Sequence, residues 1–233
     1  YCGNLIADTN LFYRGGVEYA PLYLYPAPDD LGFDTERRPN FSLAFLKALS
    51  DKLSLQQTQP HGTPEGISPE DIFHYAYAVF HSPTYRERYA GFLKIDFPRL
   101  PLTSDLELFR ALAARGLELV SLHLLDTEAA PVLKTPISPF PLAGGNDVER
   151  VRYDEAHQRV YINKTQYFEG VPPEVWEFCV GGCQVCEKWL KDRRGRQLSY
   201  DDLTHYQKIV VALRETIRLM EEIDEVIESW PIL

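Results

Sequence analysis

The stretch YINKTQYFEGVPPEVWEFCVGGCQVCEKWLKDRRGRQLSYDD, residues 161–202, combines a polar loop, paired prolines, paired glycines and the densest run of basic residues in the chain. Its first residues end a segment typical of a strand, and its last residues carry the signals that start a helix. We interpret this stretch as the working surface of a domain, with the rest of the chain holding it in place.

The segments on either side of the basic run predict a hairpin and a long helix. Residues 150–162, RVRYDEAHQRVYI, alternate in polarity around the turn-forming DEAH, which indicates a β-hairpin. Gln184–Arg194 predicts a short helix that ends at Gly195, because glycine favours the position after a helix. Ser199 then starts the last and longest helix, which we expect to run to about Glu228 with apolar residues at spacings of three and four.

The first forty residues predict strands and a loop. Residues 4–25 are rich in β-branched and aromatic residues between turn signals, which is typical of a β-meander. Residues 26–39 hold three prolines and several charges and are expected to form a surface loop. Asn40 is a suitable N-cap for a helix over Phe41–Lys52.

The middle of the chain predicts helices with clear start signals. Ser68 is followed by a proline and two acidic residues, and the helix that it starts is apolar on nearly every side, which is typical of a buried helix. Pro83 ends it, and a second helix is expected over Thr84–Leu93. Ser104 opens a capping box and a helix that reaches about Leu125.

These elements predict an α+β fold: an antiparallel sheet built from the N-terminal meander and the later hairpin, surrounded by helices, with a long C-terminal helix. We expect residues 1–233 to form a single domain. The loop 126–147, with four prolines and the pair Gly144-Gly145, is the best candidate for an internal subdivision. Because the chain begins with Tyr1 and its one methionine is Met220, we expect a fragment of a larger polypeptide or a processed chain.

The composition is that of a globular protein, with 45% hydrophobic and 25% charged residues. A net charge of −10 argues against non-specific binding to nucleic acid, but it leaves room for a local basic face. No apolar run approaches the ~20 residues needed to span a bilayer, and no signal peptide is recognisable. We therefore expect a cytoplasmic protein with no membrane partner and with reduced cysteines.

Two groups of polar residues suit contact with DNA. The basic run supplies Lys188, Lys191, Arg193, Arg194 and Arg196, residue types that bind phosphates or, for arginine, read guanine. The alternative is a solvated helix face whose cations interact favourably with the end of the helix dipole.

The second group follows the predicted hairpin. Its members are Asn163, Lys164, Thr165 and Gln166, and asparagine and glutamine amides suit the edge of adenine. The alternative is an ordinary turn at the end of a strand. Arg152 and Gln184, which lie close to the two groups in sequence, complete the predicted set of DNA-contacting residues.

The cysteines Cys179, Cys183 and Cys186 raise the possibility of a zinc site, because two of them have a ligand spacing. A convincing fourth ligand is missing; His205 is the nearest, and free thiols are the simpler interpretation. His74 could be a general base, but no nucleophile pattern accompanies it. Phosphate-binding loops, dinucleotide fingerprints and nucleophile elbows are absent as well, so we predict no metal site, no catalytic residue and a binding module rather than an enzyme.

Four longer stretches resemble one family. ADTNLFYRGGVEYAPLYLYP, PEDIFHYAYAVFHSPTYRERYAGFLKIDFPRLPL, RVYINKTQYFEGVPPEVWEF and CEKWLKDRRGRQLSYDDLTHYQKIVVALRETIRLMEEID are similar, in this order, to the C-terminal specificity domain of type ISP restriction–modification enzymes. They resemble the recognition domains of type IIG enzymes more loosely. The resemblance covers nearly the whole chain and is weakest in the loops 26–39 and 126–147.

The resemblance implies a target-recognition domain that binds double-stranded DNA. In such an enzyme the same polypeptide carries an adenine methyltransferase, a helicase-like ATPase and a nuclease, and the recognition domain places them on the site. S-adenosylmethionine, ATP and magnesium would be bound by those other domains, with no cofactor in this one. The alternative function is an acidic helical module that docks a protein partner without touching DNA.

Overall fold

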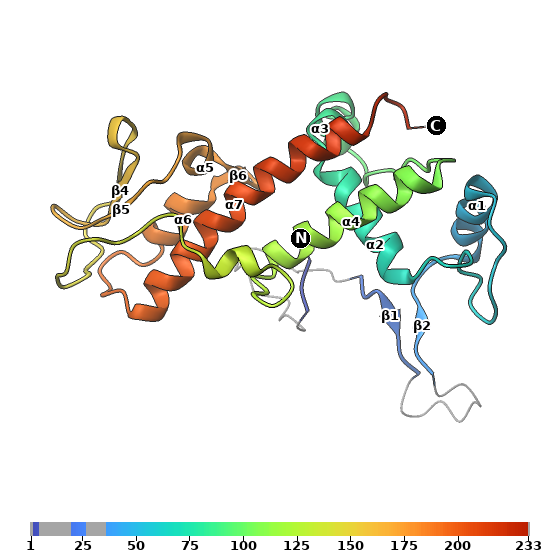
Figure 1. The fold of residues 1–233 in the computed structure, drawn as a ribbon, viewed down its shortest axis with the longest axis horizontal. Coiled ribbons are helices and arrows are strands. Elements are labelled where there is room, and N and C mark those ends of the chain that lie inside the picture. Colours follow the sequence, from blue (N-terminus) through green and yellow to red (C-terminus); the bar gives the residue numbers. More distant parts are fainter. Residues whose placement is uncertain (1, 5–19, 27–35, 233) are drawn as a thin grey trace. The chain divides into compact units, whose positions relative to one another are not determined.

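The computed structural model describes residues 2–4, 20–26 and 36–232 of the chain (Figure 1). These residues fall into two units, Tyr1–Val120 with Met220–Leu233, and Ser121–Leu219. We call them the first and the second unit. Two helices, α4 (Leu106–His123) and α7 (Tyr200–Val226), have residues in both.

The helices of the first unit start close to the expected positions. They are α1 (Leu43–Leu53), α2 (Pro69–His81), α3 (Pro83–Arg88), the beginning of α4 and the end of α7. At α2, the Ser68 hydroxyl accepts from the N–H of Asp71 at 3.1 Å and the Asp71 carboxylate accepts from the N–H of Ser68 at 2.8 Å, which confirms the predicted start. The helix expected to run to Leu93 ends at Arg88, and a separate 3-10 turn follows over Phe92–Lys94.

The N-cap of α1 is Ser42 rather than Asn40, so this prediction was wrong by two residues. Asn40 is used elsewhere: its side-chain amide donates to Pro21 O at 2.9 Å and its backbone N–H donates to Leu22 O at 2.8 Å. The Ser42 hydroxyl is then the group that accepts from the N–H of Phe45. Asn40 is thus bonded to the two residues before the N-terminal strand and does not cap the helix.

The core of the first unit forms where α2 meets α4. Tyr75 is fully buried, stacks on Phe109 with 4.6 Å between ring centroids, and donates from its hydroxyl to Pro101 O at 2.8 Å. Gly116 allows the two helices to approach, because a Cβ at this position would lie 1.9 Å from His74 O. His74 is half-buried, and burial lowers its pKa. His74 lies in the contact between α2 and α4, which favours a structural role over that of a general base.

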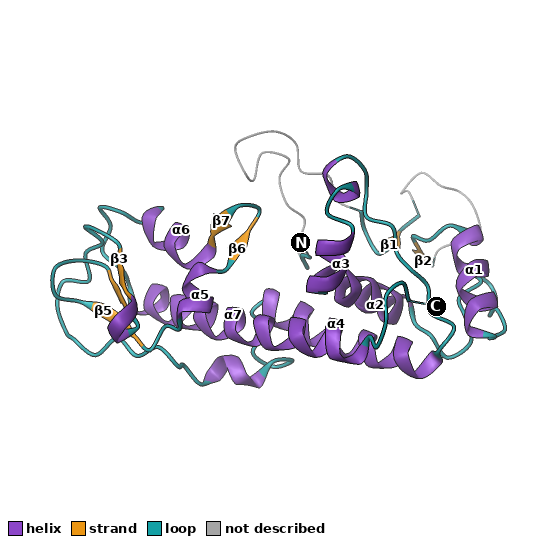
Figure 2. Ribbon diagram, turned by 90° about the horizontal axis from the view of Figure 1, so that it is seen from above, coloured by secondary structure: helices purple, strands orange, loops and turns teal. Residues whose placement is uncertain are grey.

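The second unit contains the predicted hairpin and more strands than expected (Figure 2). Strand β3 (Arg152–Asp154) pairs with β4 (Arg159–Tyr161), which confirms the hairpin, and β4 pairs on its other side with the unexpected β5 (Tyr167–Glu169). All pairings are antiparallel. The remaining elements are 3-10 turns at Pro131–Lys134 and Glu155–His157, α5 (Pro173–Glu177), β6 (Cys179–Val180), β7 (Cys183–Gln184), α6 (Val185–Lys191) and most of α7.

Within the described residues, the strands form three small sheets rather than one. In the first unit, β1 (Tyr23–Leu24) pairs with β2 (Arg38–Pro39), while β3–β4–β5 and β6–β7 are separate sheets of the second unit. The N-terminal strand finds its partner inside the segment 26–39, which was expected to be loop throughout, so it does not extend the hairpin sheet. The rest of the predicted meander, residues 5–19, lies outside the described residues.

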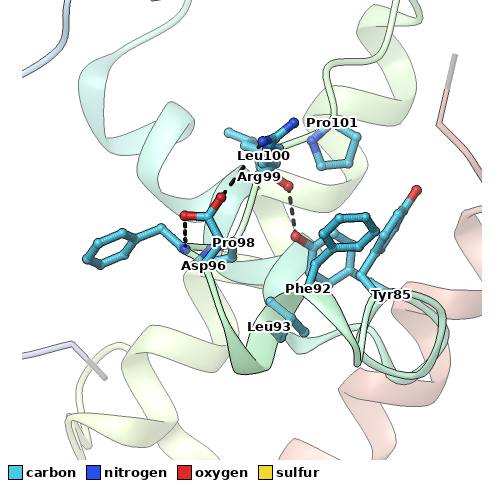
Figure 3. A pocket seen from close by; sticks show the side chains of 10 residues that line it. Tyr85, Phe92, Leu93, Asp96, Pro98, Arg99, Leu100 and Pro101 are labelled. Carbon is cyan, nitrogen blue, oxygen red and sulfur yellow. Dashed lines mark hydrogen bonds and ion pairs between the residues drawn. The ribbon is translucent and has the colours of Figure 1, made fainter.

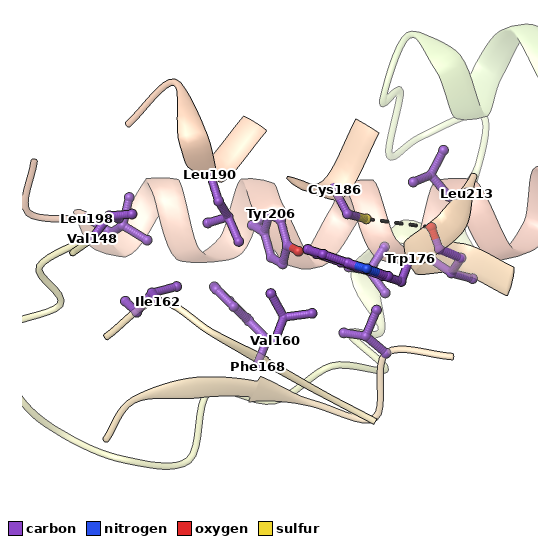
Figure 4. Close-up of a cluster of buried hydrophobic side chains, with 13 residues drawn as sticks. Val148, Val160, Ile162, Phe168, Trp176, Cys186, Leu190, Leu198, Tyr206 and Leu213 are labelled. Atoms are coloured by element: carbon purple, nitrogen blue, oxygen red, sulfur yellow. Dashed lines mark hydrogen bonds between the residues drawn. The ribbon is translucent and has the colours of Figure 1, made fainter. Parts of the chain in front are cut away.

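The core of the second unit lies between the three-stranded sheet and α7, with α6 completing it (Figure 4). Val160 and Phe168 come from the sheet, Leu190 from α6 and Tyr206 from α7, and all four are fully buried. The rings of Phe168 and Tyr206 are 4.3 Å apart. Burying an apolar side chain of this size contributes roughly 1.5–3 kcal/mol. These contacts fix the sheet against the two helices.

The start of α7 is as predicted. The Ser199 hydroxyl accepts from the N–H of Asp202 at 3.1 Å, and the Asp202 carboxylate accepts from the N–H of Ser199 at 3.0 Å. The fold is thus an α+β fold with antiparallel strands and a long C-terminal helix, as expected. No helix within the described residues combines the length and the apolar character that crossing a membrane requires.

Candidate nucleic-acid interface

The two polar groups singled out in the sequence share one scaffold in the second unit. Backbone hydrogen bonds join Val148 to the basic turn: Val148 N–H donates to Arg196 O at 2.9 Å, and Gly195 N–H donates to Val148 O at 2.8 Å. On its other side, Glu149 N–H donates to Ile162 O at 2.9 Å. The loop 144–150 therefore lies between the polar loop and the basic turn and holds both. We call residues 144–150, 163–166 and 193–198 together the three-segment surface.

Asn163 shapes the polar loop. Its side-chain oxygen, Oδ1, accepts from the N–H groups of Thr165 at 3.0 Å and Gln166 at 2.8 Å, which closes a local turn. Its amide nitrogen donates to Asp147 O at 3.1 Å. For Asn163 the structure therefore favours the alternative of an ordinary turn, because its side chain forms hydrogen bonds within the loop and to Asp147.

Gln166 is a structural residue, which corrects its prediction as a base reader. Only 3% of it is exposed. Its oxygen accepts from Asn146 N–H at 2.9 Å and from the Asn163 amide at 3.0 Å, and its nitrogen donates to Leu142 O at 3.0 Å and to Asn146 Oδ1 at 2.8 Å. Since a glutamine amide offers two donors and two acceptor sites, none is left for a base.

The remaining two residues of the polar loop, Lys164 and Thr165, are exposed at its tip. Lys164 has no ion-pair partner within the described part of the chain. The same holds for Arg196, which is exposed in the basic turn. Arg194 is also exposed; its Nε donates to Glu149 O at 2.9 Å, which leaves the other guanidinium N–H groups without a partner among the described residues. These three cations are available for an anionic ligand.

The other basic residues of the run are engaged. Lys188 forms an ion pair with Asp192 at 2.6 Å and Lys191 with Glu187 at 2.8 Å, each one helical turn apart on α6. Arg193 lies over the ring of Trp189, with 3.5 Å from its guanidinium carbon to the ring centroid, and donates to Trp189 O at 3.0 Å. For these three residues the structure favours the alternative to DNA contact, in which the cations lie on a helix face and at its C-terminal end.

The last two predicted residues lie outside the three-segment surface. Arg152 is exposed on β3, and Gln184 is half-buried on β7 directly before α6. Sequence reasoning missed a neighbour of Arg152. Arg150 is exposed, has no ion-pair partner among the described residues, and donates its backbone N–H to Ile162 O at 3.1 Å. The signal was present, because Arg150 and Arg152 are two positions apart in the alternating segment RVRYD.

The cysteines are separated. Cys179 and Cys183 are exposed on β6 and β7, but Cys183 pairs with Val180 and Cys179 with Gln184, so the two cysteines point to opposite faces of the hairpin. Cys186 is buried, and burial raises the pKa of its thiol to about 12. His205 stacks against Trp189 instead. Within the described ranges, no three histidine, cysteine or acidic residues are placed to hold a metal ion.

A hollow of about 290 Å³ lies in the first unit (Figure 3). Its lining is mostly apolar and comes from α3 and the segment 89–101. The charged residues that line it, Asp96 and Arg99, lie 3.7 Å from each other, and the Tyr85 hydroxyl donates to Arg99 O at 2.7 Å. None of the predicted DNA-contacting residues lines this hollow.

Three of the solved structures with a similar fold are parts of large proteins. The first is described as the ATP-dependent Type ISP restriction-modification enzyme LlaBIII bound to DNA (22% identity, TM-score 0.64, 93% of this chain and 14% of that one). A second is a DrdV–DNA complex (24%, 0.62, 87% and 21%), and a third is a nuclease-deletion mutant of the Type ISP enzyme LlaGI with a DNA substrate mimic (23%, 0.53, 69% and 14%). At these identities the likeness shows the fold.

The chain spans about 14–21% of the length of these proteins. No curated protein matches it. A family model does match, and it covers residues 1–222, which include the whole second unit, most of the first unit and every predicted DNA-contacting residue. The chain therefore belongs to the Type ISP C-terminal specificity domain family.

Proposed function

We propose that this chain recognises a sequence in double-stranded DNA on behalf of a restriction–modification polypeptide of which it is one part. Family membership supports this function, since the family is a specificity domain. The three similar structures, each described as a complex with DNA or a DNA mimic, support DNA as the ligand. Methylation, ATP-driven movement and cleavage would be carried out by other domains, which would also bind S-adenosylmethionine, ATP and magnesium.

The observation that carries the proposal is the charge of the three-segment surface. The surface holds five basic and two acidic residues, although the whole chain has a net charge of −10. Lys164, Arg194 and Arg196 are exposed there and are free to meet phosphates or base edges. An acidic protein that binds DNA needs such a local concentration of cations. A cytoplasmic location, where the DNA to be read is found, fits this function.

The test replaces Lys164 and Arg196, two exposed cations of the three-segment surface that form no ion pair within the described part of the chain. Binding of the chain to a labelled DNA duplex is measured between 50 and 200 mM salt, roughly the range over which phosphate contacts dominate affinity. For Lys164→Glu with Arg196→Glu, we expect weaker binding and a salt slope that falls by about 2, since each lost phosphate contact removes about 0.9. Thermal unfolding should change little, because both side chains are exposed.

A matched control makes the same charge change in the first unit. Lys52 and Lys94 are exposed on α1 and on the 3-10 turn after α3, so Lys52→Glu with Lys94→Glu alters net charge equally. This control should retain the salt slope of the unaltered chain. Equal weakening by both double variants would show that overall charge, and not the three-segment surface, governs binding.

One observation favours the alternative, a docking module without DNA contact. Beside the hollow of the first unit, Ile95 and Phe97 are 82% and 86% exposed, which is unusual for side chains of this size. On this alternative, neither pair of charge reversals changes DNA affinity. Changing Ile95 and Phe97 to aspartate would instead abolish the association of this chain with a separately expressed partner domain, as measured in a pull-down.

A further inference from the structure

The outer face of the sheet β3–β4–β5 carries an organised group of side chains that the proposed surface does not include. Val160 and Phe168 point into the core, so the residues that alternate with them along the strands point outward. The register places Arg152 opposite Tyr161, and Tyr161 opposite Tyr167. Arg159 and Glu169 are the next outward pair along the same two strands.

Each of the two arginines on this face lies over a tyrosine ring. The guanidinium carbon of Arg152 is 4.1 Å from the centroid of Tyr161, and that of Arg159 is 4.4 Å from the centroid of Tyr167. The two rings are themselves 5.1 Å apart. A guanidinium over an aromatic face is held by the charge distribution of the ring while its N–H groups stay free to donate.

The two arginines differ in what occupies those N–H groups. Arg159 donates to Glu169 Oε1 from Nε at 3.1 Å and from Nη2 at 2.7 Å, so its donor edge is occupied by a carboxylate. Arg152 has no hydrogen-bond partner among the described residues. Its nearest carboxylate, Asp154, is 4.0 Å away and already contacts His157 at 3.1 Å. Arg152 is thus oriented by the ring, with one long ion pair to Asp154 and no hydrogen bond within the described part of the chain, whereas the donors of Arg159 are already bonded to Glu169.

We propose that Arg152, held in place by Tyr161, donates a bidentate pair of hydrogen bonds to two adjacent acceptor atoms on the DNA duplex. Tyr161 is then a positioning residue, which acts through Arg152. Two groups on DNA offer such a pair of acceptors: O6 and N7 of guanine in the major groove, and the oxygens of one phosphate. The inference rests on the proposed function and deepens it, since it names the donor and the kind of acceptor.

The arrangement explains why a stacked arginine suits this role. A free arginine has many rotamers, and fixing one on binding costs conformational entropy. The ring of Tyr161 restricts Arg152 before DNA arrives, and β3 and β4 are tied to the core through Val160. A pre-oriented guanidinium presents its fork in one direction, which matches a planar pair of acceptors better than a lysine does.

The experiment uses the complete 233-residue chain and a pool of random DNA duplexes. The sequences that the chain enriches define its preference, and affinities for the enriched duplex are then compared between variants. If Arg152 reads guanine, Arg152→Ala loses preference at one G·C pair by roughly 10-fold and keeps the others. If it binds a phosphate, affinity falls equally for every duplex and the salt slope drops by about 1.

The two tyrosine variants separate positioning from simple packing. Tyr161→Phe keeps the ring and should behave like the unaltered chain, whereas Tyr161→Leu should reproduce the loss seen with Arg152→Ala while remaining folded by circular dichroism. Arg159→Ala is the matched control, because it removes an arginine from the same face whose donors Glu169 already occupies. It should leave the enriched sequence and the affinity unchanged.

The outcomes distinguish this inference from the proposed function. Unchanged binding by Arg152→Ala, together with weakened binding by the Lys164 and Arg196 reversals, overturns the role of Arg152 and leaves DNA recognition standing. Loss of affinity with Arg159→Ala equal to that with Arg152→Ala also overturns it, because the face would then act through net charge alone. No measurable binding by the unaltered chain at low salt contradicts both.

Discussion

Gln166 holds Asn146 by two hydrogen bonds, accepting from its backbone N–H at 2.9 Å and donating to its side-chain oxygen at 2.8 Å. This pair joins the polar loop to the loop 144–150, which is hydrogen-bonded to the basic turn through Val148. It joins two loops that lie about twenty residues apart in the sequence. The predictions that follow test this scaffold and the side chains that it presents.

Replacing Gln166 should destabilise the second unit. Gln166→Leu keeps a similar volume but removes the bonds that Gln166 makes to Asn146 N–H, Leu142 O and the Asn163 amide, and each hydrogen bond lost costs about 0.5–1.5 kcal/mol. Urea unfolding would measure the loss. Thr165→Ala, at the exposed tip of the same loop, should change the unfolding free energy by less than about 0.5 kcal/mol. Equal effects of the two changes would mean that Gln166 has no special structural role.

Gly144 should tolerate no side chain. A Cβ at this position would lie 2.7 Å from Gln166 Cδ, so Gly144→Ala must displace the amide that holds the scaffold. We expect a destabilisation of about 1–3 kcal/mol, as for other overpacked sites. Gly91→Ala is the control, because a Cβ there meets no atom within 4 Å. A Gly144→Ala variant as stable as this control would contradict the close approach.

The lysines of α6 should contribute less to DNA binding than Lys164 and Arg196. Their carboxylate partners lie one turn away on the same helix and place negative charge beside any bound phosphate. For Lys188→Gln with Lys191→Gln, we expect less than half of the change in salt slope produced by Lys164→Gln with Arg196→Gln. A larger effect would show that these lysines exchange their carboxylates for phosphates on binding, since exposed ion pairs are weak.

The hydrogen bonds between Ser199 and Asp202 at the start of α7 should make the free energy of unfolding depend on pH below about pH 4. Hydrogen bonds from the backbone and the hydroxyl of Ser199 lower the pKa of Asp202 from its usual value near 3.8. A lowered folded-state pKa means that the contribution is complete above about pH 4 and is lost as the pH falls through the folded-state value. At pH 7, Asp202→Asn should cost roughly 0.3–1 kcal/mol, because it removes a negative charge from the first turn of α7 and weakens the hydrogen bonds that Ser199 donates.

Unfolding of the unaltered chain and the Asp202→Asn variant is compared at pH 7 and in steps below pH 4. The difference between them should shrink as the pH falls. A difference that stays constant with pH would exclude the carboxylate as the source of the stabilisation.

Thiol labelling should separate the three clustered cysteines. Cys179 and Cys183 are exposed and should react within minutes with a maleimide in the folded protein. Cys186 is buried beside Val175 O, and the raised pKa of its thiol leaves almost no thiolate at neutral pH. Mass spectrometry of peptides should find Cys186 labelled only after unfolding in urea. Early labelling of Cys186 would place it outside the core.

Local signals predicted much of the fold. Ser68 and Ser199 were identified as helix starts because the groups that they bond lie within three residues, and the hairpin around residues 154–157 was recognised from its alternation. Predictions were wrong where a distant partner decides the outcome. Asn40 is drawn to Pro21, and β5 depends on its register with β4, which no local pattern reveals.

The candidate site shows the same division. The sequence identified which segments are polar, but it could not show that residues 144–150 join them. It also gave Asn163 and Gln166 the same weight as Lys164, although two of these side chains are consumed by hydrogen bonds within the scaffold. Whether a polar side chain is free to bind DNA depends on hydrogen-bond partners that can lie some twenty residues away, as Asn146 does from Gln166.

The backbone bonds that join Val148 to Gly195 and Arg196 have a consequence for how such a domain can acquire a new target. Main-chain hydrogen bonds are indifferent to the identity of the side chains beside them. Positions 164, 165, 194 and 196 can therefore be exchanged with little penalty to folding, while Gly144, Asn146 and Gln166 keep the geometry. The backbone geometry is thus kept while the exposed side chains vary. A library randomised at those four positions is a direct route to altered DNA preference.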